Sequence, residues 1–142
     1  LQPELTSYPY AKPGDVLPCS RPRLFRTADG VEIPISPDLF SDPWEVRLEK
    51  FSSDGQYAWL FYNARGHQQL QIVQIELATG KHQLIIDETS STFLHYSAPG
   101  KYQLWWLDDT TALWSSERSG WNHLYRIDML TGQVLKPVTS GQ

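Results

Sequence analysis

The sequence has very few sulfur-containing residues and no excess of positive charge. Its 142 residues include one cysteine, Cys19, and one methionine. A single cysteine excludes an internal disulfide and any zinc site built from several cysteines. Lysine and arginine together number 12 against 16 acidic residues, giving a formal net charge of −4, whereas a nucleic-acid groove needs a basic stripe. We therefore expect no nucleic-acid partner.

Long hydrophobic runs and targeting signals are also missing. No stretch approaches the roughly 18 consecutive apolar residues of a membrane span, and Leu1 does not open a basic-then-apolar signal peptide. We expect no membrane segment. The chain begins in a loop and stops just after a strand, which predicts a segment of a longer polypeptide.

The sequence lacks the usual catalytic and metal-binding motifs. It has no Gly-x-Ser-x-Gly elbow, which presents the nucleophile in many serine hydrolases. Four histidines without metal-ligand spacing are scattered along the chain: His67, His82, His95 and His123. We expect each to be an ordinary strand or turn residue, with no metal and no cofactor. A serine, a carboxylate and a histidine do occur close together, as Ser115, Ser116, Glu117 and His123, but strand serines beside a polar turn explain them better.

What the sequence does contain favours β structure. Aromatic residues make up 13% of the chain, including six tryptophans, and such side chains suit a pleated, half-buried surface. Four of the tryptophans could line a carbohydrate or peptide groove, but their strand spacing is more typical of packing between sheets: Trp105, Trp106, Trp114 and Trp121. The acidic pair Asp108-Asp109 is interpreted as a turn whose carboxylates accept backbone N–H groups, not as paired catalytic acids.

Alternation and turn signals predict a succession of short antiparallel strands. They cover residues 23–27, 31–35, 44–51, 57–62, 69–77, 82–87, 112–116, 123–127 and 134–138, with 91–96 and 103–107 competing for one further strand. In the stretch 44–51 we expect Trp44, Val46 and Leu48 to form the buried face.

An internal repeat organises these strands. The hairpin turns centre on Gly30, Gly80 and Gly132, which are 50 and 52 residues apart, and residues 75–80 align with 127–132 without a gap. A four-stranded propeller blade takes about 40–50 residues. We therefore predict an all-β chain of antiparallel four-stranded blades, a partial propeller of about two and a half blades. Residues 1–22 form an extended proline-rich arm, 23–43 end one blade and cross over, and 44–88 and 89–142 are blades.

Several segments carry a resemblance to a known family. They are residues 106–109 (WLDD), 113–125 (LWSSERSGWNHLY), 131–132 (TG) and 138–141 (VTSG), preceded by 8–15 (YPYAKPGD) with Pro18. These closely resemble the N-terminal propeller of the dipeptidyl peptidase IV family, in the prolyl oligopeptidase group of serine peptidases. The resemblance implies an eight-bladed propeller capping an α/β-hydrolase domain that removes dipeptides from peptide N-termini after proline or alanine.

The same resemblance places the chemistry outside this chain. The family's catalytic triad would lie beyond Gln142, and its paired glutamates, which hold the substrate amine, would precede Leu1. We therefore expect no catalytic residue here. The family places a substrate-lining loop near residues 95–100, which makes His95 and Tyr96 the candidate substrate-binding residues. Residues 27–30 form a tight turn where relatives carry a dimerisation arm, so dimerisation through that arm is not expected.

The expected partners follow from this reading. They are a peptide substrate of the parent protein, the missing blades and hydrolase domain, and further copies of the chain through open, apolar blade faces. The resemblance favours a periplasmic or secreted protein. The alternative function is a non-enzymatic propeller scaffold that binds proteins or glycans.

Overall fold

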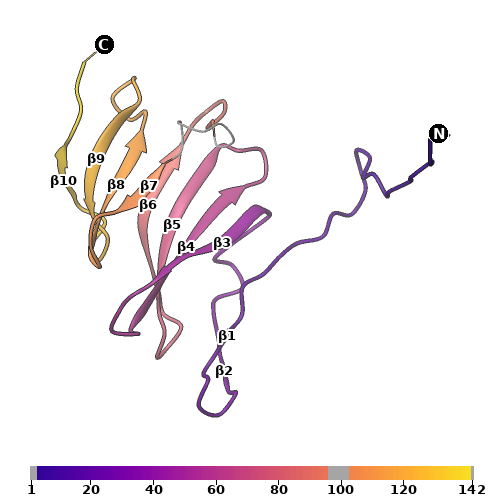
Figure 1. Ribbon diagram of the computed structural model, residues 1–142, viewed down its shortest axis with the longest axis horizontal. Helices are drawn as coiled ribbons and strands as arrows, with labels where there is room; N and C mark the ends of the chain where they lie inside the picture. The colour runs from indigo at the N-terminus through magenta and orange to yellow at the C-terminus, as the bar shows by residue number, and fades with distance from the viewer. Residues whose placement is uncertain (1–2, 96–102, 142) are drawn as a thin grey trace.

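The computed structural model of the chain describes residues 3–95 and 103–141, and all regular structure within them is β (Figure 1). The strands in chain order are β1 Leu24–Phe25, β2 Glu32–Ile33, β3 Pro43–Phe51, β4 Tyr57–Ala64, β5 Gln69–Glu76, β6 His82–Thr89, β7 Leu104–Trp106, β8 Thr111–Ser116, β9 His123–Asp128 and β10 Val134–Pro137. No helix long and apolar enough to cross a membrane occurs among the described residues.

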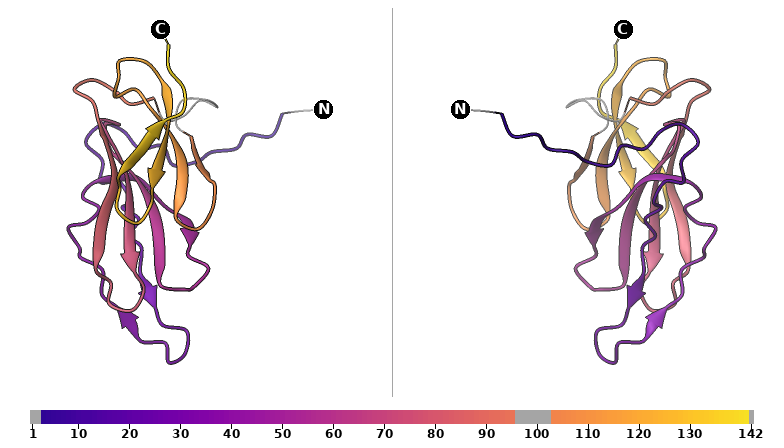
Figure 2. Two further views of the ribbon diagram at one scale, coloured as in Figure 1. Left: turned by 90° about the vertical axis from the view of Figure 1, so that its left-hand side faces the viewer. Right: turned by 90° about the vertical axis from the view of Figure 1, so that its right-hand side faces the viewer.

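The strands form a small hairpin and two four-stranded sheets. β1 pairs with β2 alone, while the larger sheets have the orders β3-β4-β5-β6 and β7-β8-β9-β10, antiparallel throughout. Each is a simple meander, the arrangement of a propeller blade. The predicted fold class, all-β with antiparallel four-stranded blades of a partial propeller, is confirmed. Figure 2 shows the hairpin lying at the opposite end of the molecule from the C-terminus.

The prediction for the first strand of the second sheet is resolved in favour of the later segment. Leu104–Trp106 forms β7, and a strand over 91–96 is wrong for residues 91–95, which are irregular. Residues 91–95 instead bind the turn between β4 and β5: Leu94 N donates to His67 O at 2.7 Å, and Gln68 Nε2 donates to Ser91 O at 3.1 Å. These hydrogen bonds occupy main-chain groups of residues 91–95 that would otherwise pair with a neighbouring β-strand.

The predicted buried face of β3 is wrong for Trp44 and Leu48, whereas Val46 is partly buried and packs against a buried cluster on β4 and β5. Trp44 is 52% exposed and Leu48 49% exposed. β3 is the edge strand of its sheet, and its pairing with β4 shifts register between Pro43 and Glu45 and again between Leu48 and Lys50. Each shift interrupts the alternation of side chains between the two faces, so a simple period-2 reading fails along this strand.

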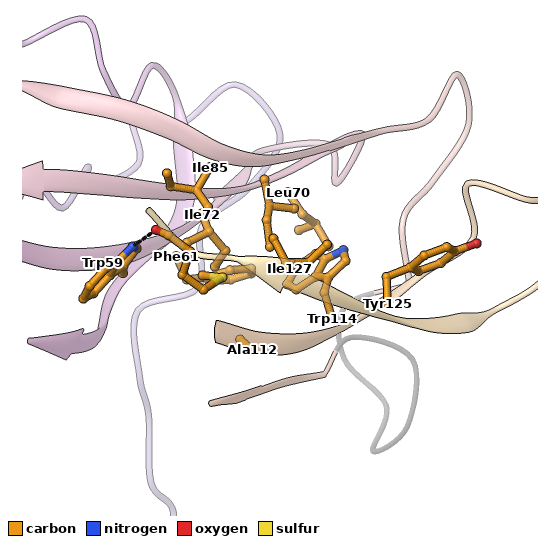
Figure 3. Packing of buried hydrophobic residues seen from close by; sticks show 11 residues of the cluster. Trp59, Phe61, Leu70, Ile72, Ile85, Ala112, Trp114, Tyr125 and Ile127 are labelled. Atoms are coloured by element: carbon orange, nitrogen blue, oxygen red, sulfur yellow. Dashed lines mark hydrogen bonds between the residues drawn. The ribbon is translucent and has the colours of Figure 1, made fainter. Parts of the chain in front are cut away.

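The main hydrophobic core lies between the two large sheets (Figure 3). Trp59 of β4 donates its indole Nε1–H to the main-chain carbonyl of Met129, at 2.8 Å, across the interface. Both sheets contribute buried side chains: Trp59, Phe61, Leu70, Ile72, Ile85 and Ile86 from the first, and Ala112, Trp114, Tyr125, Ile127 and Met129 from the second or the turn that follows β9. The sheets are therefore packed face to face as one body.

The tryptophans divide between the core and the surface. Trp114 is fully buried between the sheets and Trp106 packs against the same cluster, which confirms the packing role predicted for both. Trp105 is 43% exposed on the other face of the second sheet. Trp121, expected to be a packing anchor, is 59% exposed. It follows Gly120 in the loop between β8 and β9, beyond the paired residues, so the sheet interface does not reach it.

A second core covers the opposite face of the first sheet. This core joins the hairpin and the crossing loop to β4 and β5. The hairpin side contributes Leu24 of β1 and Ile35 just after β2, and the crossing loop contributes Leu39 and Phe40. They pack against side chains of β4 and β5: Ala58, Leu60, Tyr62, Val73 and Ile75. The first sheet is thus covered on both faces. Residues 3–22 form no strand and, apart from the partly buried Pro22, are exposed, and Figure 1 shows this segment leading away from the sheets.

Two glycines mark the same contact at successive places in the chain. Gly80, in the turn between β5 and β6, has a φ of 76° and lies against the carbonyl of Pro34 just after β2. Gly132, in the turn between β9 and β10, has a φ of 77° and lies against the carbonyl of Ile85 in β6. The hairpin therefore contacts the first sheet through the same kind of glycine turn by which the first sheet contacts the second.

Candidate functional site

Three connecting segments meet at one end of the first sheet, and we call this the loop end: residues 41–43, 64–68 and 90–95. Arg65 ties the first two together, since its N–H donates to Asp42 O at 3.0 Å and its guanidinium pairs with the Asp42 carboxylate at 3.1 Å. Ser90 N donates to Gln68 O at 3.0 Å. The loop end includes His95, the candidate substrate-binding residue. Tyr96 and the rest of the loop to residue 100 lie outside the described residues.

A row of four rings runs across the loop end. Successive ring pairs are Trp44 and His67 at 5.1 Å, His67 and Phe93 at 5.7 Å, and Phe93 and His95 at 6.4 Å between centroids, each in an edge-to-face arrangement. Such pairs are worth about 0.5–1.5 kcal/mol each beyond their buried area. Trp44 and Phe93 are each about half exposed. The row therefore offers apolar ring surface to a partner.

His67 is one of the two inner members of this row. Burial lowers its pKa from the ordinary value, and the nearby Arg65 cation lowers it further. The imidazole is therefore neutral at physiological pH, and its Nδ1 lies 3.1 Å from Oδ1 of the fully buried Asn63. A neutral imidazole can donate through one ring nitrogen and accept through the other.

Two residues of the loop end hold backbone conformations that are uncommon for side-chain-bearing residues. Asp42 has a φ of 44° and His67 a φ of 55°. Positive φ outside glycine is rare, although Asp and His are enriched among the exceptions, and such residues concentrate at binding and switch sites. In addition, two polar atoms are buried without a hydrogen-bond partner: Nδ1 of His95 in the loop end, and Nδ2 of Asn63, which directly precedes the segment 64–68. Unpaired buried polar atoms are few in native proteins, so the loop end combines two uncommon features.

His95 also borders a small cavity between the two sheets. The cavity has a volume of about 30 Å³ and is lined in part by Glu88, Trp114 and Ser116. This is small compared with ligand pockets, which are usually about 300–1,000 Å³.

An ion pair beside this cavity joins the sheets. Glu88 Oε1 of β6 accepts from Arg118 Nη2 at 2.5 Å and from Trp114 Nε1 at 2.9 Å. Arg118 also donates from Nε to Ser116 Oγ at 2.8 Å and lies over the Tyr125 ring. Arg118 lies in the loop that follows β8. Its pairing with Glu88 links the two sheets.

The serines and histidine that suggest hydrolase chemistry do not form a catalytic arrangement. Ser115 and Ser116 are buried in β8. The Ser115 hydroxyl accepts from Gln103 N at 2.9 Å. Although Ser116 faces His123 in the strand register, His123 Nε2 lies 3.1 Å from the main-chain carbonyl of Gly141. This is the kind of backbone contact that a strand histidine is expected to make.

The acidic pair occupies the turn between β7 and β8, as predicted. Asp108 accepts from the hydroxyl and N–H of Thr111 and from Thr110 N, and these bonds lower its pKa to about 2, led by the Thr111 hydroxyl. Asp109 bonds the Ser53 hydroxyl and pairs with Lys50 at 2.9 Å, and both contacts lower its pKa. A general acid needs a raised pKa. Both residues are therefore structural, and Asp109 ties the turns of the two sheets together.

These lowered pKa values predict an acid-labile contact. A carboxyl group whose pKa is lower in the folded state stabilises that state above its unfolded pKa, and the contribution is lost as pH falls through the folded pKa. For Asp108 the window runs from about pH 4 to about pH 2. Asp108→Asn keeps an acceptor but cannot titrate. We expect thermal melts of the two proteins to differ at pH 7 and converge as pH falls to 2. A constant difference between them would contradict the assignment.

No metal-binding cluster is found in the part of the chain described here, where no three His, Cys, Asp or Glu side chains come together suitably. The loop end can bind through ring surface and hydrogen bonds. Sequence reasoning identified His95 in this site but missed Trp44, His67 and Phe93, because the three lie far apart in the chain. The position of His67 directly after the Asn-Ala-Arg-Gly turn was the one available signal.

Comparison with known families agrees with this description. The family model for the dipeptidyl peptidase IV (DPP IV) N-terminal region matches residues 1–142. The match covers the arm, the hairpin and both sheets, and the fold described above is that of partial propeller blades. The chain therefore belongs to the dipeptidyl peptidase IV N-terminal region family.

Proposed function

We propose that this chain is a non-catalytic portion of the propeller of a dipeptidyl-peptidase-IV-like serine exopeptidase. The parent releases dipeptides from peptide N-termini after proline or alanine, and this portion helps to shape and gate the chamber that the peptide enters. The observation that carries the proposal is the family match over residues 1–142. The partners of the chain are the remaining blades, the hydrolase domain and the peptide substrate.

The division into blades is part of the proposal. Residues 23–43 complete the outer half of one blade, 44–88 form the next, and 89–142 form a third. The repeated contact of Gly80 with Pro34 and of Gly132 with Ile85 supports this division, because the same turn meets the same part of the preceding unit each time. Residues 1–22 are the arm that leads into the first of these units.

The loop end is the proposed chamber-facing surface. Half-exposed Trp44 and Phe93 flank the neutral His67, and His95 continues the row. Ring faces of this kind accept apolar and proline side chains without charge complementarity. The row would thus contact a passing peptide while leaving the chemistry to the hydrolase domain.

The parent coding sequence beyond Gln142 tests the identity of the enzyme. We expect a Gly-x-Ser-x-Gly elbow in a hydrolase domain downstream of the propeller. A stop codon soon after the propeller would overturn the peptidase proposal and favour the alternative, a non-enzymatic propeller scaffold that binds proteins or glycans.

The chamber role is tested in the parent enzyme with His95→Ala. We expect a changed ratio of kcat/KM between a long proline-containing peptide and a dipeptide-linked chromogenic substrate, because the loop end would contact only the longer chain. His82→Ala is the matched control, since His82 lies at the opposite end of β6 and is exposed. Equal ratios in both variants and wild type would contradict a chamber-facing loop end.

A further inference from the structure

The two half-exposed rings of the loop end, Trp44 and Phe93, are held in position by neighbouring contacts. The Arg65 guanidinium lies over the Trp44 ring, 5.6 Å from its centroid. Leu94, the residue after Phe93, donates its N–H to His67 O at 2.7 Å, which ties the segment carrying Phe93 to the turn between β4 and β5. Groups that are already fixed lose little entropy when a ligand binds. The two rings therefore form a prepared contact surface.

The spacing of these rings suits one kind of peptide. Their centroids lie 5.1 and 5.7 Å from that of His67, so the distance between Trp44 and Phe93 cannot exceed the sum of these two steps. A polyproline II helix has three residues per turn and advances about 9.3 Å in each turn, which falls within that limit. Residues i and i+3 lie on the same side of such a helix. Two prolines with this separation can therefore each meet one ring.

The charges around the rings favour an uncharged ligand. Arg65 pairs with the Asp42 carboxylate at 3.1 Å. His67 is neutral at physiological pH, because burial and then the Arg65 cation lower its pKa. These three side chains together carry no net charge. Proline has no charged group and no backbone N–H, so a proline-rich segment matches this surface in charge as well as in spacing.

We propose that Trp44 and Phe93 bind a polyproline II segment of a peptide, with prolines three residues apart resting on the two rings. Aromatic-lined surfaces bind such segments in several domain families, because the polyproline II helix is preformed and loses little entropy on binding. In the parent enzyme the segment would belong to the peptide substrate, beyond the dipeptide that is released. The inference rests on the proposed function for this placement, but the binding itself does not depend on the parent.

Two nonapeptides of identical composition test the inference on residues 1–142. One repeats Pro-Ala-Ala three times, whereas the other has the same residues with its prolines separated by two and by four positions. Both are acetylated and amidated, so neither carries a terminal charge. We expect the regular peptide to bind about tenfold more tightly, since losing one aromatic contact at a binding site typically costs about that much. It should also shift the NMR signal of the Trp44 indole N–H.

Substitutions of exposed rings locate the site. Phe93→Ala should weaken binding of the regular peptide about tenfold and remove the preference between the two peptides, and Trp44→Ala should act in the same way. Phe25→Ala is the matched control, because Phe25 is 47% exposed against 48% for Phe93 but lies in β1 of the hairpin. This control should bind both peptides as the wild type does.

The outcomes separate this inference from the proposed function. Equal affinities of the wild type for the two peptides would overturn the polyproline II register. No binding at millimolar peptide would overturn the site and leave the proposed function intact, because a hydrolase domain beyond Gln142 does not depend on it. Equal weakening by Phe25→Ala and Phe93→Ala would contradict the location. A parent without a hydrolase domain would overturn the proposed function and the placement in its chamber, but not the binding measured on residues 1–142.

Discussion

Replacing Trp114 by alanine is expected to lower the free energy of unfolding by about 3–5 kcal/mol, the usual cost of removing a large buried aromatic side chain. Trp114 has no exposed surface, and it belongs to the cluster that both sheets share. Its Nε1 also donates to Glu88 of the first sheet at 2.9 Å. The change therefore removes core volume and leaves the carboxylate with one donor fewer.

Urea denaturation followed by far-UV circular dichroism measures this effect. Trp121→Ala is the matched control, because the same residue type is replaced where it is 59% exposed in a loop. Exposed substitutions of this kind usually change stability by less than about 0.5 kcal/mol. Equal losses for the two variants would contradict the packing of the two sheets around Trp114.

Replacing Gly132 by alanine is expected to destabilise the chain by at least about 2 kcal/mol, because two costs add. Its φ of 77° lies in the left-handed region, which costs a side-chain-bearing residue roughly 1–2 kcal/mol. An added Cβ would also lie 2.6 Å from the Ile85 carbonyl oxygen. Since that oxygen belongs to strand β6, relief requires the sheets to separate. Gly80→Ala should act similarly on the hairpin, where the Cβ would lie 2.1 Å from Pro34 O.

Gly55→Ala isolates the conformational cost. Gly55 has a φ of 69°, close to those of the other two glycines, but an added Cβ would meet nothing within 4 Å. We expect only the conformational penalty of roughly 1–2 kcal/mol there. The comparison uses midpoints of chemical denaturation for all three variants. If Gly55→Ala proved as harmful as Gly132→Ala, the close approach between successive units would not be a determinant of stability.

The strand order was readable from the sequence because turn chemistry is local. Asp54 accepts from Gln56 N and Asp108 from Thr110 N, each closing a turn within two residues of itself. The glycines at 80 and 132 likewise mark hairpins by their own backbone conformation. Such signals depend on neighbours in the sequence, and they located nearly all the strands and the repeat.

Predictions from the sequence failed where the environment of a residue depends on residues far away in the chain. Alternation along β3 predicted a buried Trp44, but β3 is an edge strand with two register shifts. Trp121 resembled a packing anchor by residue type alone, and only the sheet geometry shows that the interface ends before it. The ring row of the loop end joins β3, the β4–β5 turn and the segment after β6, so no local pattern could reveal it.

The central claim is that this chain forms part of a chamber wall and supplies no catalytic group. Incubation of residues 1–142 with a Gly-Pro-linked chromogenic substrate tests it most directly. The account predicts release of chromophore at the rate of buffer alone, across a range of protein concentrations. A rate that rises in proportion to protein concentration and persists through repurification would contradict it.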